Sequence, residues 1–218
     1  MKKIKIAVYG AGGFGREVAW LAQTAVFCGH GFDVVSFIDD DDRICETTMN
    51  DIEILSLARA RDKYSGACVV SGIGVPEIRE VTTQKACAAG FCFATLVHPN
   101  VEMSKWIEIG EGTVICAGNI FTTNIRLGKH VQVNLNCTIG HDVIMDDYAT
   151  LAPGAHISGC VHLGKRVYVG TGAVIVNGTQ NRPIEIGDDA VIGAGACVTQ
   201  SVPSGETWIG VPARPVRK

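Results

Sequence analysis

The stretch that decides the fold is "VNLNCTIGHDVIMDDYATLAPGAHISGCVHLGKRVYVGTGAVI", Val133 to Ile175, in which an apolar residue returns at every sixth position. Counting backwards by six extends the series to Val97, and it resumes at Ile186 after the segment "NGTQNRPIE". Neither the helical period nor strand alternation keeps one residue class at every sixth place. The sequence therefore predicts a repeat architecture from residue 97 onward.

A six-residue unit is one short strand and one turn, too small to bury a core alone, so neighbouring units must stack. Three units would close a triangular coil, and residues 97–203 would supply about six coils. The fifth position of each unit is usually small or β-branched, and we expect its occupant, for example Cys137, in the core. Ile175 and Ile186 are eleven residues apart instead of six, so the "TQNRP" segment should protrude as a loop.

The first part of the chain has a different pattern, in which short apolar strands alternate with helical segments. This order predicts a parallel sheet with right-handed crossovers. It also predicts two domains, residues 1–96 and 97–218. The expected strands are 4–10, 33–42 and 66–74, and the expected helices are 15–27, 54–62 and 76–90.

The segment "YGAGGFGRE" follows the first expected strand and carries the G-x-G-x-x-G pattern of Gly10, Gly12 and Gly15. Such a loop lets a phosphate approach the backbone and the start of the next helix. Asp39 and Asp40 end the second strand, where these folds contact a ribose. Only about ninety residues precede the repeat, which is half of a dinucleotide fold, so we expect a mononucleotide or a nucleotide-linked sugar. The alternative is that the glycines only form a tight turn.

Composition excludes several classes of partner. The net charge is −3, so the chain lacks the basic surface of a nucleic-acid-binding protein. No apolar run approaches the ~20 residues that span a bilayer, and the basic start resembles neither a signal peptide nor an anchor. We therefore expect a cytoplasmic protein whose nine cysteines are reduced thiols.

Both halves together resemble the sialic-acid O-acetyltransferase and bacterial nucleotide-aminosugar N-acetyltransferase family of hexapeptide-repeat acyltransferases. The resemblance rests on "YGAGGFGREV", "FIDDD", "GIG", "HPNVEMS", the long repeat quoted above, "IGAGACVTQSVP" and "IGVPARPV". It implies a half-Rossmann-like α/β domain that holds a nucleotide sugar, followed by a left-handed parallel β-helix that holds acetyl-CoA. It also implies a homotrimer with active sites between subunits, and no metal.

The resemblance further implies roles for individual residues. His141 matches the family's general base and Asp142 the acid beside it. Thr150 stands where many members carry a second histidine near the acetyl group, and Phe14 where many carry a histidine in the glycine loop. The matched contacts to the nucleotide sugar are Gly12, Gly13, Phe14, Asp39, Asp40 and Gly74, and those to the coenzyme are Thr150, Gly159, Thr171 and Ala194.

Chemistry suits a base at His141, because thioester aminolysis needs an amine free of its extra proton and a neutral imidazole accepts one. From its place in the repeat alone, His141 would be interpreted as an ordinary surface histidine, and it is the resemblance that favours the base. Asp142 could fix the ring tautomer. Neighbours in a strand point to opposite faces, so direct contact requires a coil corner, or else a bridging water; the sequence leaves this open. A nucleophilic Cys137 is disfavoured by its core position.

Zinc catalysis by His141, His156 and His162, as in carbonic-anhydrase-like solenoids, is a further alternative. No two of these histidines are one coil apart, so they should not stack within a chain. His156 and His162 are expected in turns or at an interface.

The sequence thus predicts an acetyltransferase that moves acetyl from acetyl-CoA to the amine of a UDP-, dTDP- or GDP-linked 4-amino-deoxy sugar, as in lipopolysaccharide or O-antigen biosynthesis. Sialic-acid O-acetylation and a non-catalytic nucleotide-binding scaffold are the remaining alternatives.

Overall fold

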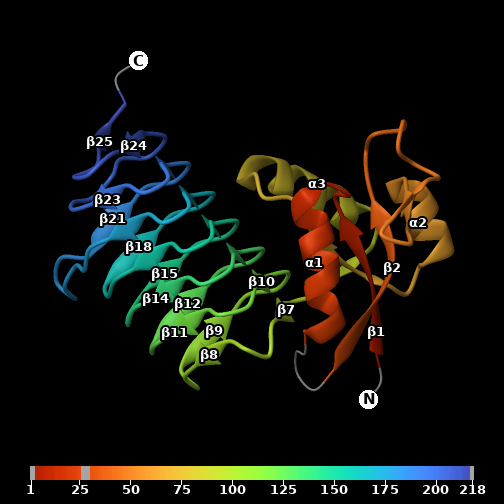
Figure 1. The fold of residues 1–218 in the computed structure, drawn as a ribbon, viewed down its shortest axis with the longest axis horizontal. Helices are drawn as coiled ribbons and strands as arrows, with labels where there is room; N and C mark the ends of the chain where they lie inside the picture. Colours follow the sequence, from red (N-terminus) through yellow and green to blue (C-terminus); the bar gives the residue numbers. More distant parts are fainter. Residues whose placement is uncertain (1–2, 26–29, 217–218) are drawn as a thin grey trace. The chain divides into compact units, whose positions relative to one another are not determined.

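The structure, a computed structural model, describes residues 3–25 and 30–216. The chain divides into two compact units, Met1–Pro99 and Asn100–Lys218 (Figure 1). Within the described residues, no helix combines the length and the apolar character needed to cross a membrane.

The first unit is a mostly parallel sheet with three helices. Within the described residues its strand order is β3-β4-β2-β1-β5-β6, with the β3–β4 pair antiparallel and the other pairs parallel. The elements are β1 Lys3–Tyr9, α1 Gly13–Thr24, β2 Gly31–Ile38, β3 Thr48–Met49, β4 Ile52–Leu55, α2 Leu57–Lys63, β5 Cys68–Ser71, α3 Pro76–Ala88, β6 Cys92–Phe93 and β7 Leu96–Val97.

Both faces of this sheet are covered. Ala7 and Tyr9 of β1 pack in one cluster with Ala60 of α2 and Ala86 of α3, and Ile6, which alternates with them, is also fully buried. Continuous burial of this kind explains why the second half of β1, Ile6 to Tyr9, is an apolar run, whereas the exposed Lys3 and Lys5 alternate in its first half.

Several predicted boundaries need correction. The segment 54–62 was predicted as one helix, but its first two residues belong to β4, which pairs with β2, and Ser56 then caps α2. The predicted end of the first helix at residue 27 lies outside the described residues. The antiparallel hairpin of β3 and β4 and the short strand β6 were not predicted.

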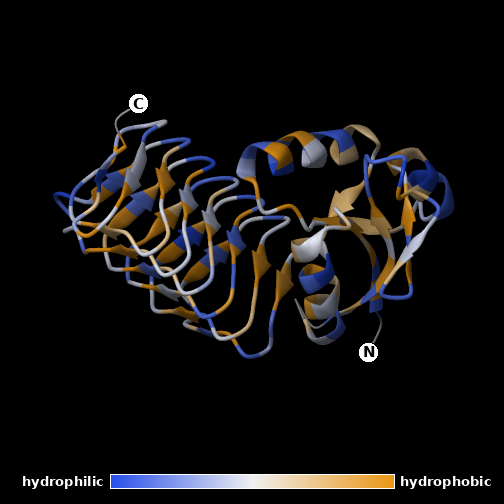
Figure 2. Ribbon diagram, turned by 45° about the horizontal axis from the view of Figure 1, so that its top comes forward, coloured by the Kyte–Doolittle hydropathy of each residue, from blue (hydrophilic) through white to orange (hydrophobic). Residues whose placement is uncertain are grey.

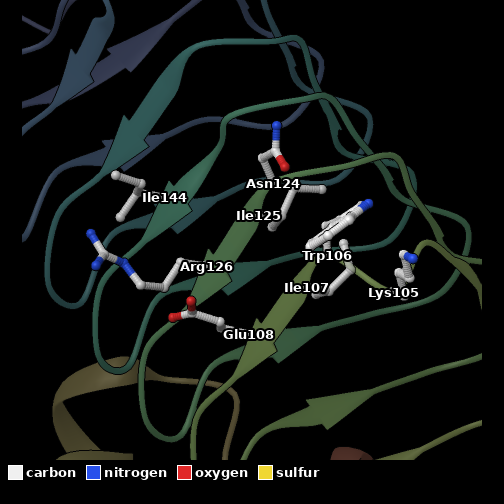
Figure 3. A pocket seen from close by; sticks show the side chains of 8 residues that line it. All are labelled: Lys105, Trp106, Ile107, Glu108, Asn124, Ile125, Arg126 and Ile144. Atoms are coloured by element: carbon white, nitrogen blue, oxygen red, sulfur yellow. The ribbon is translucent and has the colours of Figure 1, made fainter.

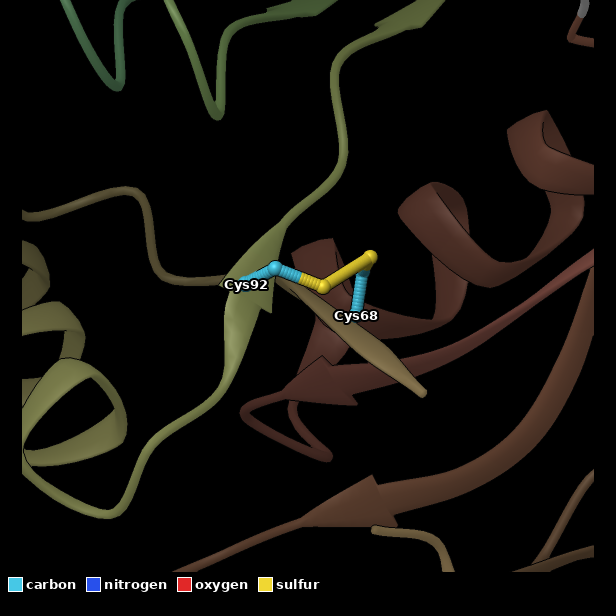
Figure 4. Close-up of a disulfide and its surroundings, with 2 residues drawn as sticks. All are labelled: Cys68 and Cys92. Carbon is cyan, nitrogen blue, oxygen red and sulfur yellow. A yellow bond between two sulfur atoms is a disulfide. The ribbon is translucent and has the colours of Figure 1, made fainter. Parts of the chain in front are cut away.

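Cys68 and Cys92 form a disulfide between the adjacent strands β5 and β6, where they are direct partners in the register (Figure 4). The expectation that all nine cysteines are reduced thiols is therefore wrong for this pair. Parallel pairing brings the two residues together although they are 24 apart in sequence, and nothing in the local sequence marks that proximity.

The second unit is a parallel β-helix, as the six-residue period predicts (Figure 1). Its three sheets have the orders β25-β24-β22-β19-β16-β13-β10, β23-β20-β17-β14-β11-β8 and β21-β18-β15-β12-β9. The strands are β8 Glu102–Met103, β9 Ile107–Ile109, β10 Val114–Ile115, β11 Ile120–Phe121, β12 Ile125–Leu127, β13 Gln132–Val133, β14 Thr138–Ile139, β15 Ile144–Met145, β16 Thr150–Leu151, β17 His156–Ile157, β18 Val161–Leu163, β19 Tyr168–Val169, β20 Val174–Ile175, β21 Ile184–Ile186, β22 Val191–Ile192, β23 Cys197–Val198, β24 Thr207–Ile209 and β25 Arg214–Pro215.

The register confirms the predicted coil. Thr138 pairs with His156 and His156 with Val174, so successive coils are eighteen residues apart. From Ile115 to Val198, every apolar residue of the series is at most 2% exposed. Figure 2 shows the corresponding hydrophobic segments along the stacked strands. The predicted loop is also confirmed, because Thr179 and Arg182 exchange backbone hydrogen bonds at its tip.

Candidate active site

The glycine loop joins β1 to α1, and its glycines fall into two groups. Gly10, Gly15 and Gly72 pack backbone against backbone. A Cβ at Gly15 would lie 2.9 Å from the carbonyl carbon of Gly10, and one at Gly72 would lie 3.2 Å from the nitrogen of Gly15. These three glycines are explained by close strand-to-helix packing.

Gly12, Gly13 and Gly74 have no such explanation. A Cβ at Gly12 or Gly74 would meet no atom within 4 Å, and one at Gly13 would meet only Arg16, at 3.9 Å. Gly12 is also the N-cap of α1 and has no side chain to accept a hydrogen bond from the first-turn amides. Open space beside helix amides suits an anionic ligand, which favours ligand binding over a turn alone.

The two acids at the end of β2 already have protein partners. Asp39 accepts hydrogen bonds from the backbone N–H of Ala11, at 2.9 Å, and of Asp41, at 3.0 Å, and so ties the glycine loop to β2. Asp40 accepts from the Tyr9 hydroxyl, at 2.8 Å, and from Lys85 Nζ, at 2.6 Å. Although partial burial opposes it, these two hydrogen bonds lower the pKa of Asp40. Both carboxylates therefore hold the glycine loop in its shape, and their contact with a ribose stays a prediction.

A buried arginine supports the same region, and the sequence analysis missed it. Arg79 of α3 is fully buried, and its Nη1 donates to the carbonyl oxygens of Ile73, at 3.0 Å, and Gly74, at 3.2 Å. The arginine thereby fixes the loop that carries Gly74. Its signal in sequence was weak, because a single arginine in a polar helix resembles a surface charge. Phe14, in contrast, is half-buried in the first turn of α1.

In the second unit, His141 and Asp142 lie in the turn between β14 and β15, at a corner of the coil. Nδ1 of His141 is 2.8 Å from Oδ2 of Asp142, so the two side chains are in direct contact. Contact between sequence neighbours is possible because Asp142 has a φ of 58°, a left-handed conformation that aspartate tolerates. The corner geometry that the sequence left open is therefore present.

The electrostatics of the pair suit proton transfer. The hydrogen bond with His141 lowers the pKa of Asp142 below its ordinary 3.8, and a weaker one from Asn124 acts in the same direction. A charged carboxylate at neutral pH fixes the proton of the neutral imidazole on Nδ1, which leaves the lone pair on Nε2. The His141 side chain is 59% exposed, so the ring borders solvent.

Gly159 lies one coil above His141, and the imidazole packs against its backbone. A Cβ at position 159 would lie 2.6 Å from Cε1 and 2.8 Å from Cδ2 of the ring, and closer still to Nε2. The missing side chain of Gly159 therefore makes room for the imidazole. The sequence analysis assigned Gly159 only to the coenzyme and did not predict this contact with His141.

The coenzyme residues do not gather at one place within a chain. Gly159 lies in a turn between β17 and β18, at the same coil corner as His141. Thr171 and Ala194 lie in turns before β20 and β23, at a different corner. These two corners lie at opposite ends of the strands in the sheet that contains β14, β17 and β20. Thr150, on β16, is only 1% exposed.

A surface hollow adjoins the His141 corner (Figure 3). Its lining is mixed, with the exposed ring of Trp106 beside charged and aliphatic side chains. Asn124 belongs to this lining and also donates from Nδ2 to Oδ1 of Asp142, over 3.4 Å. The sequence analysis missed Asn124, whose signal was its place one coil before Asp142. The hollow is lined by Lys105, Trp106, Ile107, Glu108, Asn124, Ile125, Arg126 and Ile144.

The rival catalytic groups are less favourable. Cys137 has no exposed surface, and burial raises the pKa of its thiol to about 11, which makes it a poor nucleophile. His156 and His162 lie on strands β17 and β18, not in turns. His156 is paired with Thr138, and His162 with Asp146 and Glu185. In the part of the chain that the structure describes, no group of potential metal ligands combines the three histidines.

Comparison with known proteins agrees with this architecture. Residues 5–86 match the model of the PglD N-terminal domain. The chain is 34% identical to GDP-perosamine N-acetyltransferase of Escherichia coli O157:H7, over 97% of this chain and 96% of that protein.

Two solved structures match along the whole chain. WeeI from Acinetobacter baumannii AYE is 36% identical with a TM-score of 0.89, covering 98% of this chain and 100% of that one. The acetyltransferase domain of PglB from Neisseria gonorrhoeae FA1090, solved with acetyl coenzyme A, is 30% identical with a TM-score of 0.84, covering 99% and 100%.

These matches confirm the predicted fold class, a half-Rossmann-like α/β domain followed by a left-handed parallel β-helix. The identity to the Escherichia coli enzyme extends over both units of the chain, so it is not confined to the repeat. The chain therefore belongs to the family of PglD-like hexapeptide-repeat acetyltransferases and is an acetyl-CoA-dependent N-acetyltransferase.

Proposed function

We propose that this enzyme transfers acetyl from acetyl-CoA to the amine of a nucleotide-linked 4-amino-deoxy sugar, with His141 as general base. The observation that carries the proposal is the contact between Nδ1 of His141 and Oδ2 of Asp142, 2.8 Å, at an exposed corner of the β-helix. The substrate class is supported by the relative named GDP-perosamine N-acetyltransferase.

In this mechanism the sugar amine attacks the thioester carbonyl carbon while Nε2 of His141 accepts a proton from the amine. Asp142 accepts the hydrogen bond from Nδ1 and stabilises the imidazolium that forms. The carbon–sulfur bond then breaks, and the coenzyme leaves as a thiol after it takes up a proton. Direct attack needs no acyl-enzyme, which agrees with the burial of Cys137.

We propose that the nucleotide binds at the open side of the glycine loop, where Gly12, Gly13 and Gly74 leave space beside the α1 amides. Phe14 would contact the nucleotide sugar from the first turn of the same helix. Asp39 and Asp40 would contribute indirectly, because their carboxylates are already engaged in holding the loop.

We further propose a homotrimer in which each coenzyme lies between two subunits. Within a chain, Gly159 follows strand β17 and Thr171 precedes strand β20, so the two residues lie at opposite ends of the strands of one sheet. A ligand that contacts both positions is most simply held between two chains. Ile120 and Val174 lie on the same sheet and are 43% and 36% exposed, as expected of strands that pack on a partner. We place the reaction in the cytoplasm, in surface-glycan synthesis, as the sequence resemblance implies.

The test is an acetylation assay on GDP-, UDP- and dTDP-linked 4-amino-deoxy sugars, with free sialic acid as the rival acceptor. We expect turnover with at least one nucleotide amino sugar, and loss of most of it in His141→Ala with nucleotide-sugar binding retained. Preferential O-acetylation of sialic acid would refute the acceptor assignment, and unchanged turnover of His141→Ala would refute the base.

A further inference from the structure

We propose that His141, Asp142 and Cys160 form an inhibitory site for a borderline divalent metal ion, represented by Zn²⁺. The proposal rests on the proposed function, because it assumes that His141 is the base. In the described part of the chain, these residues are the group whose nitrogen, oxygen and sulfur ligand atoms all lie within 4.8 Å of one another.

The coil brings these ligands together. Cys160 lies one coil above Asp142 in the same column of turns, and both have left-handed backbones, with φ of 55° and 58°. The backbone N–H of Cys160 donates to the carbonyl oxygen of His141, over 2.9 Å, which ties the two turns to each other. Three potential ligands from two coils therefore converge at one corner.

The geometry requires only small movements. Zinc binds imidazole nitrogen at about 2.0–2.1 Å and thiolate sulfur at about 2.3 Å, which puts neighbouring ligand atoms of a tetrahedral site roughly 3.3–3.7 Å apart. Cys160 is 7% exposed and would keep its position, whereas the side chains of His141 and Asp142 are 59% and 33% exposed and have room for small shifts toward the ion. A solvent-facing imidazole also leaves room for water as a fourth ligand.

The ligand types favour one class of ion. Sulfur and imidazole select zinc and similar transition metals, whereas magnesium and calcium prefer sites built of oxygen alone. A metal on Nε2 of the imidazole would occupy the lone pair that accepts the proton of the amine, and a metal on Nδ1 would leave the ring proton on Nε2; either arrangement removes the base. The ion would therefore stop acetyl transfer.

Binding is tested first, on the full chain treated with chelator and reductant. We expect Co²⁺, as a spectroscopic substitute for Zn²⁺, to bind with one thiolate-to-cobalt charge-transfer band. Loss of supporting residues alone weakens metal sites by about 10–100-fold, so loss of a ligand in Cys160→Ser or Cys160→Ala should weaken binding at least about 100-fold. Cys87→Ser, which removes an exposed thiol of α3, is the matched control and should bind as the native chain does.

Inhibition is tested at buffered free Zn²⁺, with acetylated sugar quantified by chromatography because zinc also binds the thiol of free coenzyme A. Each variant is compared with its own metal-free rate. We expect Zn²⁺ to inhibit the native chain and the Cys87→Ser control, and to require at least about 100-fold more free metal in Cys160→Ser.

The outcomes separate this proposal from the proposed function. Cobalt binding without a thiolate band, or unchanged in Cys160→Ser, refutes the site; if His141→Ala is then still inactive, the base assignment stands. Metal binding without inhibition refutes the inhibitory role, and an active His141→Ala in that case also removes the base assignment.

Discussion

The substitution Gly159→Ala tests whether the imidazole of His141 is positioned by the coil above it. A Cβ at residue 159 would lie 2.6 Å from Cε1 of the ring, whereas ordinary contacts begin at 3.4 Å. The ring must therefore move by at least about 0.8 Å, because Nε2 would be closer still. A misplacement of about 1 Å in a reacting group can cost about 100-fold in rate.

We accordingly expect kcat to fall about 100-fold, or roughly 2.7 kcal/mol in the barrier. The fold itself should tolerate alanine, because Gly159 does not have a left-handed backbone and alanine restricts the unfolded chain. Steady-state kinetics and the thermal midpoint measure these two effects separately. Gly66→Ala is the matched control, since a Cβ there meets no atom within 4 Å.

The kinetic pattern also distinguishes two roles for Gly159. Displacement of the base lowers kcat while the dissociation constant of coenzyme A is unchanged. If the glycine serves only to let the coenzyme approach, KM for acetyl-CoA rises instead. A kcat within twofold of the native value, with an unchanged thermal midpoint, would refute the positioning argument.

Three further predictions follow from the geometry. Asp142→Asn keeps the left-handed turn but removes the charge, and loss of a charged hydrogen bond, about 1.5–3 kcal/mol, should lower kcat about 10–100-fold. Asn124→Ala, which removes a 3.4 Å hydrogen bond to that carboxylate, should lower kcat less, and equal losses in the two variants would contradict this order. Gly74→Ala should raise KM for the nucleotide sugar at an unchanged thermal midpoint, because a Cβ at residue 74 meets no protein atom within 4 Å. Gly72→Ala should lower the thermal midpoint, because a Cβ at residue 72 meets the backbone of Gly15. The reverse result would show that packing does not separate the two glycines. Burial raises the pKa of Cys137 from 9.0 to about 11, so between these pH values the native state keeps a proton that the unfolded chain loses. The free energy of unfolding should therefore fall by roughly 2–3 kcal/mol as the pH rises from 9.0 to about 11. Denaturant unfolding against pH measures this loss, and Cys137→Ala should lack it; identical slopes for the two proteins would rule out the buried thiol as its source.

The sequence predicted the β-helix well because the apolar residues of the six-residue period lie in the interior of the coil. It predicted the first unit less well where a short apolar run fits both the helical and the strand period. Ile54 and Leu55 suit either the start of a helix or the end of a strand, and only their pairing with Phe37 and Ile38 of β2 decides. The disulfide was missed for a related reason, since strand pairing, not local sequence, brings Cys68 to Cys92.

The candidate site shows the same division. His141 and its neighbour Asp142 could be predicted from the chain, but the contacts of Asn124 and Gly159 with this pair could not, because they come from the coils before and after it. Asn124 acts through a hydrogen bond to Asp142, and Gly159 acts through the absence of a side chain. An absent atom leaves no chemical signal in a sequence with 26 glycines.

The coil geometry also explains why the activity should depend on assembly. In a single chain, His141 and Thr171 lie at opposite ends of the strands of one sheet, and Ile120 and Val174 on that sheet are exposed. In the proposed trimer, a second chain packed against this sheet would complete the groove between the two positions. If so, dilution below the dissociation constant of the trimer should abolish turnover, while nucleotide-sugar binding, which needs only the glycine loop of one chain, persists. Activity per chain that is constant through dissociation, followed by analytical ultracentrifugation, would show that each chain carries a complete site.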